Sequence, residues 1–304
     1  MAKQNLAFLY GRVAKAPAIS KNRETGEYNY GMVYIDTVRG FRAVDDGLNY
    51  VKHEYPLLMS KEKEHIENFM GWVENDIVLI KGVVTSKKIK KSSFCDNPDC
   101  HDENGNPTKN TAYGNLIYIT PLYLEKLRHC DSKEAAEEEL LKHREVSNCA
   151  YVYGQLLKDP KLFTTKRGVK ITQYPIAINR KYTIRTDDPS IRTDWPIVKS
   201  YGEQALDDKT YLHYQSEILV DGYLQARTVR RKTKCEKCGK IYEWKDHTME
   251  IVPYATEYIK NFRTKEEVEE EQQKTVEEYK QMLFEQDVKD DMPEGLGSTD
   301  VQEN

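Results

Sequence analysis

The chain has 304 residues, a mass of 35.5 kDa and a formal net charge of -4, which is enough length for two domains of ordinary size. Its 21 tyrosines are far more than a disordered chain would carry, and no window approaches the roughly 18 apolar residues of a membrane-spanning helix. The first residues also lack the basic and apolar regions of a signal peptide. We therefore expect a folded, soluble protein located in the cytoplasm.

Charge is distributed unevenly along the chain. Residues 262–304 contain five basic and fourteen acidic residues, so they carry a net charge of -9 and residues 1–261 carry +5. A basic body with an acidic tail is typical of nucleic-acid-binding proteins, and the same charges also fit a solvated helix with a frayed end. Residues 266–286 have the composition of a helix, and the segment beyond them is predicted to be disordered.

Three blocks of sequence occur twice and in the same order. The block NLAFLYGRVAKAP, which begins at Asn5, matches NCAYVYGQLLKDP, which begins at Asn148. The other two pairs are residues 75–100 with 216–238 and residues 116–127 with 249–259. Repetition of this kind indicates two copies of one structural unit.

The repeats predict four segments in the chain. They are a divergent first domain, a helical linker, a second domain, and an acidic helix with a disordered tail, at residues 1–130, 131–147, 148–261 and 262–304.

Both repeats have the pattern of β-strands. Residues 28–37 and 171–180 alternate in part between apolar and polar side chains, and DIVLIKGVV and EILVDGYLQAR show the same pattern. Gly82 and Gly222 interrupt the last two segments, which predicts a bulge or a sharp bend in each strand. About five short, bent strands in roughly 110 residues favour a small closed barrel over a sandwich.

The second repeat carries several motifs in a defined order. YGQLLKDP opens it, AINR ends its second strand at Arg180, TDW lies in its third strand, and DGYLQAR forms its fourth. These motifs resemble those of the bacterial single-stranded DNA-binding proteins. The first repeat shares LYGRVAKAP and DIVLIKGVV but diverges between Thr37 and Trp72, so we interpret it as a degenerate second copy. The resemblance implies an all-β chain of two tandem OB-fold barrels without enzyme activity.

Single strands are held without sequence readout by a cationic groove and by aromatic side chains on which bases stack. The resemblance places Trp195 and Tyr201 at stacking positions, and Arg180 at the end of a strand that faces the groove. Alternation along the strands adds several aromatic residues, among them Tyr174 and Tyr182, and the candidates in the first repeat include Tyr30, Tyr34, Tyr50 and Trp72. The alternative for each aromatic residue is packing in a barrel core or at its rim.

A run of cations follows the fourth strand of each repeat. It consists of Lys87, Lys88 and Lys90 in the first repeat and of Arg227, Arg230, Arg231 and Lys232 in the second. We expect these side chains in a long hairpin, where they would contact phosphates. A hairpin that is merely solvated is the alternative.

Four of the six cysteines lie in the same two predicted hairpins. Cys95 and Cys100 are separated by four residues, and Cys235 and Cys238 by two. Because two thiolates on a turn form half of a tetrahedral zinc site, the two pairs predict one structural zinc ion that joins the repeats through zinc-ribbon-like hairpins.

Other roles for these cysteines are separate zinc sites that recruit His101 and His247, or no metal at all. A redox role is disfavoured because no βαβ context surrounds the CxxC motif. A zinc deaminase is excluded because its Pro-Cys-x-x-Cys motif is missing, since the CxxC pair follows Lys234.

These patterns predict a single-stranded DNA-binding protein that coats and protects exposed strands in DNA replication, recombination or repair. Its expected partners are single-stranded DNA, replication or recombination proteins bound through the acidic C-terminal segment, and a second copy of the chain in a homodimer. The rival hypothesis is a zinc-stapled OB-fold scaffold of a replication or transfer complex with weak nucleic-acid binding. An RNA-binding protein is a third hypothesis, because OB-folds do not by themselves discriminate between the two sugars.

Overall fold

The first half of the chain folds into β-strands and one helix, which lies between the fifth and the sixth strand. A computed structural model describes residues 4–40, 51–186, 188 and 190–290. In chain order the elements of this half are β1 (Gln4–Val13), β2 (Ala18–Lys21), β3 (Tyr28–Val38), β4 (His53–Glu54), β5 (Leu57–Ser60), α1 (Lys63–Met70), β6 (Asp76–Phe94) and β7 (Lys109–His129). The predicted stacking residue Tyr50 lies outside the described residues.

The second half repeats this order of elements. It consists of β8 (Asn148–Leu156), β9 (Lys161–Thr164), β10 (Lys170–Asn179), β11 (Thr193–Asp194), β12 (Ile197–Tyr201), α4 (Gly202–Tyr211), β13 (Glu217–Lys234) and β14 (Ile241–Lys260). Two short helices, α2 (Lys133–Lys142) and α3 (Arg144–Ser147), lie between the halves. The sequence repeat is thus also a repeat of secondary structure.

The strand pairings recur as well, and they close a ring in each half. In the first half β1 pairs with β6, β6 with β7, β7 with β5, β5 with β3, and β3 with β1. In the second half the equivalent ring runs through β8, β13, β14, β12 and β10. Closing a sheet in this way removes its edges, and buried side chains from both rings form one apolar cluster.

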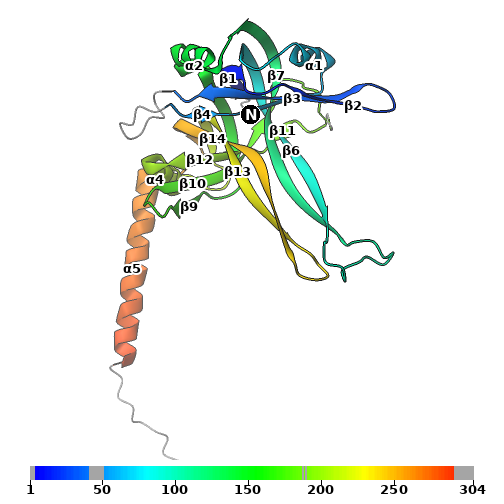
Figure 1. The fold of residues 1–304 in the computed structure, drawn as a ribbon. Coiled ribbons are helices and arrows are strands. Elements are labelled where there is room, and N and C mark those ends of the chain that lie inside the picture. The colour runs from blue at the N-terminus through cyan, green and yellow to red at the C-terminus, as the bar shows by residue number, and fades with distance from the viewer. Residues whose placement is uncertain (1–3, 41–50, 187, 189, 291–304) are drawn as a thin grey trace, which may run out of the picture. The chain divides into compact units, whose positions relative to one another are not determined.

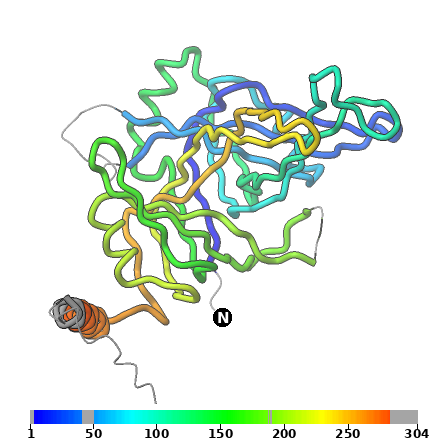
Figure 2. The backbone as a smooth tube through the Cα atoms, turned by 90° about the horizontal axis from the view of Figure 1, so that it is seen from below, coloured from blue at the N-terminus to red at the C-terminus, as the bar shows by residue number. Residues whose placement is uncertain are grey.

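The two rings are joined through their first strands. β1 pairs antiparallel with β8, from Gln4 opposite Tyr153 to Leu9 opposite Asn148. Because β1 and β8 are equivalent strands, their antiparallel pairing relates the two halves by an approximate twofold axis. Figure 2 shows the blue and cyan strands of the first half beside the green strands of the second.

Gly82 and Gly222 lie at equivalent irregularities in β6 and β13. The strand register shifts between Lys81 and Gly82 in one half and between Asp221 and Gly222 in the other, which confirms the predicted bulges. A Cβ atom at Gly82 would lie 2.5 Å from Ile119 Cγ2, and one at Gly222 would lie 2.2 Å from the Val252 carbonyl oxygen. Glycine is therefore required at both positions, because the neighbouring strand passes too close for any side chain.

Asn5 and Asn148, which begin the repeated blocks, perform the same structural task. Asn5 donates to the Val84 carbonyl (2.9 Å) and accepts from the Val84 amide (2.8 Å). Asn148 does the same with Leu224, at 2.9 Å for both bonds, and both asparagines are buried. Each amide side chain thereby satisfies two backbone groups of the next strand, which would otherwise be buried without these partners.

We expect Asn148→Ala to lower the free energy of unfolding by roughly 3 kcal/mol, because each buried polar group left unpaired costs about 1–3 kcal/mol. Urea unfolding followed by circular dichroism measures the change. The matched control is Asn115→Ala, which removes an exposed side chain from β7 and should change the stability by less than about 0.5 kcal/mol. Equal stability of the two variants would contradict the assigned role.

The C-terminal segment is a separate unit of the structure, which begins at Arg263. Its helix α5 (Lys265–Asp290) begins with reciprocal hydrogen bonds between Thr264 and Glu267, which is the capping-box arrangement. Across the described residues, no helix is long and apolar enough to cross a membrane.

Candidate nucleic-acid interface

Two long β-hairpins, β6–β7 and β13–β14, extend out of the rings (Figure 1). In each hairpin the part next to the ring is largely buried, whereas the outer part alternates between exposed and half-buried residues. The sequence changes in the same place from apolar segments to runs of Lys, Arg, Ser and Thr, so the outer parts need other contacts to hold them in position.

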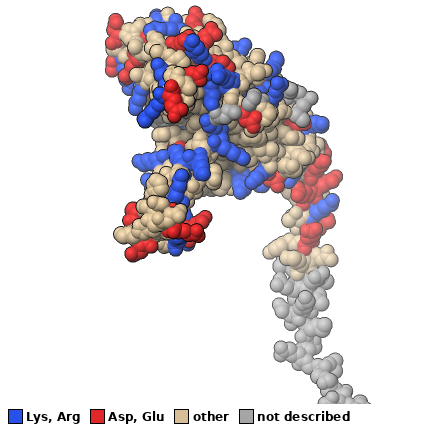
Figure 3. All heavy atoms as spheres, turned by 90° about the vertical axis from the view of Figure 1, so that its right-hand side faces the viewer, with Lys and Arg blue, Asp and Glu red and all other residues tan. Residues whose placement is uncertain are grey.

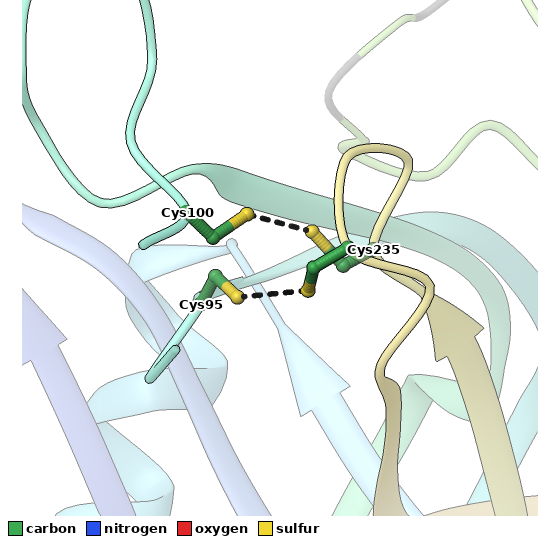
Figure 4. A group of neighbouring side chains, drawn as sticks. Cys95, Cys100 and Cys235 are labelled. Carbon is green, nitrogen blue, oxygen red and sulfur yellow. Dashed lines mark hydrogen bonds between the residues drawn. The ribbon is translucent and has the colours of Figure 1, made fainter. Parts of the chain in front are cut away.

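The tips of the two hairpins meet through the four cysteines. Cys95 and Cys100 lie on one tip and face Cys235 on the other (Figure 4), and the Sγ–Sγ distances are 3.6 Å for Cys95–Cys238 and 3.5 Å for Cys100–Cys235. All four sulfur atoms lie within 4.8 Å of one another, and three of the cysteines are buried. The predicted convergence of the two cysteine pairs is confirmed.

The local turns explain why the sulfur atoms point toward one centre. The Cys235 amide donates to the Lys240 carbonyl (2.8 Å), the Gly239 amide donates to the Cys235 carbonyl (2.9 Å), and Gly239 has a φ of 75°. A positive φ favours glycine, so the CxxCG sequence suits this tight turn. Backbone amides of Cys238 and Lys237 hold the pKa of Cys235 at about 6, which favours the thiolate form that binds metals.

Tyr242 supports Cys95 from the opposite hairpin. Its hydroxyl donates to Cys95 Sγ (3.0 Å) and lies 2.6 Å from Asp96 Oδ1, and Lys240 Nζ pairs with the same carboxylate at 2.7 Å. The Tyr242 hydrogen bond lowers the pKa of Cys95. Hydrogen bonds to ligand sulfurs of this kind are common around metal sites, where they orient the ligands.

The geometry fits a tetrahedral metal ion. Four sulfur atoms at about 2.3 Å from a central zinc ion would be separated by about 3.8 Å, which is close to the distances of 3.6 Å for Cys95–Cys238 and 3.5 Å for Cys100–Cys235. Among the described residues, neither His101 nor His247 belongs to the cysteine group, so the alternative of two separate sites is not the arrangement observed.

Ion pairs also connect the outer parts of the hairpins. Asp246 on β14 pairs with Lys91 of β6 and with Arg231 of β13, both at 2.7 Å. The Arg231 guanidinium packs against Gly114 on β7, where a Cβ atom would lie 2.9 Å from Cζ. Arg231 is therefore held in the contact between the hairpins, where its side chain is half-buried.

The structure divides the predicted cations into two groups. Arg227 pairs with Glu250 (2.9 Å), Arg231 with Asp246, and Lys232 with Glu243. Lys88, Lys90 and Arg230 are exposed and form no ion pair within the described part of the chain, whereas Lys87 is half-buried on β6. Lys and Arg gather along the hairpins and the adjoining body, and acidic residues gather at the tips (Figure 3). The exposed cations are the side chains best placed to contact phosphates.

Three predicted aromatic residues are partly accessible. Trp195 is half-buried beside the base of β6, where its backbone amide donates to Ser86 Oγ (2.9 Å). Tyr201 is half-buried at the end of β12, with Lys199 Nζ 5.6 Å from its ring centroid. Tyr182 is half-buried in the segment after β10.

Three other predicted contacts need correction because their side chains are buried. Tyr174 is fully buried and donates to Asp208 Oδ2 (2.9 Å), and Trp72 is 4% exposed and packs on Phe69. Arg180 is 6% exposed and pairs with Asp194 (Nη2–Oδ1 2.7 Å). Alternation predicts a strand but does not show which of its faces is buried. Arg180 neutralises the buried carboxylate of Asp194, so its charge is not available to DNA.

The buried Arg180–Asp194 pair has an equivalent in the first half. There Arg39 pairs with Glu54 (Nε–Oε1 2.7 Å), which occupies the β4 position that Asp194 occupies in β11. Each carboxylate also accepts a hydrogen bond from a backbone amide of the other half. Glu54 accepts from Ala226 (2.8 Å), and Asp194 accepts from Ser86 (2.7 Å). The two ion pairs thus join the halves at both sides of the approximate twofold axis.

This equivalence reveals an aromatic residue that was not selected from the sequence. Tyr55 follows Glu54 as Trp195 follows Asp194, and its side chain is 42% exposed. The signal was present as EYPL against DWPI, which share an acidic residue, an aromatic residue and proline in a row. Divergence of the first repeat around this segment had hidden the correspondence.

Comparison with known proteins finds similarity between the second half of the chain and single-stranded DNA-binding proteins. Residues 147–242 match the Single-strand binding protein family. Over 85 residues, or 28% of the chain, the sequence is 34% identical to single-stranded DNA-binding protein 2 and 32% identical to single-stranded DNA-binding protein 1, both from Staphylococcus aureus. The matches span 59% and 53% of the length of these relatives. The predicted resemblance to the bacterial single-stranded DNA-binding proteins is confirmed for this region.

The likeness in fold extends over both halves. The wild-type single-stranded DNA-binding protein from Thermus aquaticus superposes with a TM-score of 0.51 at 13% identity, covering 87% of this chain and 97% of that one. A deletion mutant of the Thermus aquaticus protein gives a TM-score of 0.52 at 14% identity. At such identities the likeness concerns the fold, and the mostly-strand chain therefore has the fold of single-stranded DNA-binding proteins.

Proposed function

We propose that this protein binds and protects single-stranded DNA during replication, recombination or repair. The observation that carries the proposal is the family match of residues 147–242, because this region contains both Trp195 and the cationic strand β13. The two rings of strands would act as tandem OB-fold barrels, at residues 1–130 and 148–261, with residues 131–147 as the linker.

Binding in this proposal needs no catalytic step. Trp195 and Tyr201 offer aromatic faces on which bases stack, and the exposed Lys88, Lys90 and Arg230 neutralise phosphates. Because neither interaction reads base identity, the protein would coat strands of any sequence. The acidic C-terminal segment would serve replication or recombination proteins as a docking site, and the chain would form a homodimer.

We further propose that Cys95, Cys100, Cys235 and Cys238 hold one structural zinc ion. Supporting this are the mutual distances of the four sulfur atoms and the burial of three of the four cysteines. Zinc bound by four protein ligands has no open coordination position, so its role would be to fix the two hairpins to each other.

A zinc-stapled scaffold with weak nucleic-acid binding is the competing function, and it is favoured by the ion pairs that tie Arg227, Arg231 and Lys232 to neighbouring carboxylates. Titration of the protein into fluorescent oligo-dT and a matched duplex at several salt concentrations separates the two functions. We expect tight, salt-sensitive binding to the single strand alone. Absence of strand binding at low salt would overturn the DNA-binding proposal in favour of the scaffold.

Removing the three exposed cations together, in Lys88→Ala/Lys90→Ala/Arg230→Ala, should weaken binding to oligo-dT roughly 10- to 100-fold at 0.1 M salt. The slope of log affinity against log salt should become shallower by about 2, since each lost phosphate contact on a single strand contributes about 0.7. The control Lys209→Ala/Lys274→Ala/Lys280→Ala removes the same charge from exposed positions on α4 and α5. An equal loss in both variants would indicate a general charge effect rather than hairpin contacts.

A further inference from the structure

A cavity of about 630 Å³ lies between the first half and the bases of both hairpins. Its lining includes Lys15 after β1, Tyr34 on β3 and Tyr55 before β5, all from the first half. The opposite wall includes Arg227 on β13 and Met249 on β14, which belong to the second half. The cavity is therefore built by both halves together, and its volume is in the range of sites that hold small organic ligands.

The lining is suited to a flat, partly apolar group. Leu57, Ile117 and Met249 are buried and supply apolar surface. Tyr34 is half-buried and Tyr55 is 42% exposed, so both rings lie at the boundary between the apolar lining and solvent. Tyrosine ordinarily has a pKa of about 10, so both phenols are neutral at physiological pH and do not repel an anion.

The charged residues of the lining are mainly cationic. Lys15 is exposed and has no ion pair among the residues described, and Lys133 is exposed with Glu137 at 3.4 Å. Arg227 is half-buried beside Glu250, and Glu74 is the one carboxylate of the lining. Aromatic faces over an apolar surface, with cations nearby, match the chemistry of a nucleotide, which has a planar base and a phosphate.

The approximate twofold axis gives a second, independent argument. Tyr55 is equivalent to Trp195, and Arg227 is equivalent to Lys87, because each cation follows its bulge glycine by five residues. Trp195 lies against the base of β6, through the bond from its amide to Ser86 Oγ. Tyr55 thus lines one cavity with Arg227, and Trp195 bonds to the residue next to Lys87.

We propose that this cavity is a nucleotide subsite in which one base of a bound single strand packs against Tyr55 while its phosphate is held by Lys15. The inference rests on the proposed DNA-binding function and extends it to the first repeat. DNA bound in this way would contact both halves, so the path of the strand would cross the approximate twofold axis.

The test combines affinity with the site of cross-linking. Tyr55→Ala should weaken binding to oligo-dT roughly 5- to 150-fold, as expected for one lost stacked base, while Tyr55→Phe keeps the aromatic face and most of the affinity. Lys15→Ala is a second variant, at an exposed position where folding is not at risk. Tyr214→Ala, which removes an exposed tyrosine outside the cavity, is the control and should bind normally. Irradiated oligo-dT carrying 5-iododeoxyuridine should cross-link to the peptide that contains Tyr55.

Each outcome has a distinct meaning. Normal binding by Tyr55→Ala and Lys15→Ala, with cross-links confined to the peptide of Trp195, would overturn the subsite and leave the DNA-binding function intact. Failure of the wild-type protein to bind oligo-dT at low salt would overturn both proposals. Thymidine monophosphate is the last probe. If it binds the wild-type protein but not Tyr55→Ala, and does not compete with oligo-dT, the cavity binds free nucleotides and the proposed strand contact is wrong.

Discussion

Replacing Cys235 with serine is expected to reduce the zinc content from one ion per chain to nearly none and to lower the Tm by roughly 10 °C. Serine is not among the residues that commonly bind zinc, and the free energy of binding a structural zinc ion adds directly to the stability of the folded state. Because a loss of 1 kcal/mol lowers the Tm of a chain this size by about 2–4 °C, a 10 °C shift corresponds to about 3–5 kcal/mol. Metal analysis of the purified protein and thermal unfolding provide the two measurements.

The matched control for this experiment is Cys130→Ser. Cys130 is also buried but packs with Leu140 and Ala136 of α2, outside the cysteine group. The Cys130→Ser variant should keep its zinc ion. A chelator should lower the stability of this variant as much as that of the wild-type protein, and should leave the stability of Cys235→Ser unchanged. If wild-type protein purified with excess zinc contains no metal, the zinc proposal is wrong, and the cysteine cluster is then held by the ion pairs and hydrogen bonds around it.

Replacing Arg180 with alanine should lower the free energy of unfolding by about 3–5 kcal/mol, because removal of one partner leaves the other charge buried and uncompensated. Asp194 is 0% exposed, and Arg180 supplies two of its hydrogen bonds. The destabilised carboxylate is also the group that accepts from Ser86 in the other half. Urea unfolding monitored by circular dichroism measures the loss.

Two comparisons make the Arg180 result specific. Arg185→Ala removes a cation from an exposed position in the same segment and should leave the stability within about 0.5 kcal/mol of the wild type. Arg180→Ala/Asp194→Ala, which removes both charges, should be more stable than Arg180→Ala alone. A variant Arg180→Ala that unfolds normally but binds oligo-dT weakly would restore the sequence-based prediction that this arginine contacts DNA.

Several features of this protein could be predicted from short stretches of sequence. Gly82 and Gly222 signalled bulges because a glycine inside an apolar strand marks a close approach of another chain segment. The two cysteine pairs signalled a shared cluster because close thiols on turns suit metal binding. The motifs around Trp195 were sufficient to indicate the resemblance of the second half to the Single-strand binding protein family, which the comparisons confirm.

Other features could not be predicted, since they depend on which face of a strand is buried. Tyr174 and Trp195 are both aromatic residues in or beside strands, yet one is fully buried and the other half-exposed. Arg180 and Arg230 have the same side chain, but only Arg180 has a carboxylate positioned to neutralise it inside the protein. Burial is a property of the whole packed structure, so no local pattern distinguishes these pairs.

The two repeats, the strand pattern, the bulge glycines, the cysteine pairs and the resemblance of the second repeat could all be read from the amino-acid sequence, because each is encoded in short stretches of consecutive residues. Which cations remain exposed, and the cavity between the halves, became clear only from the three-dimensional packing. These features arise from the antiparallel pairing of β1 with β8, which brings residues more than a hundred positions apart into contact. Spatial neighbours of this kind are set by packing across the twofold axis and leave no signal at any single position in the chain.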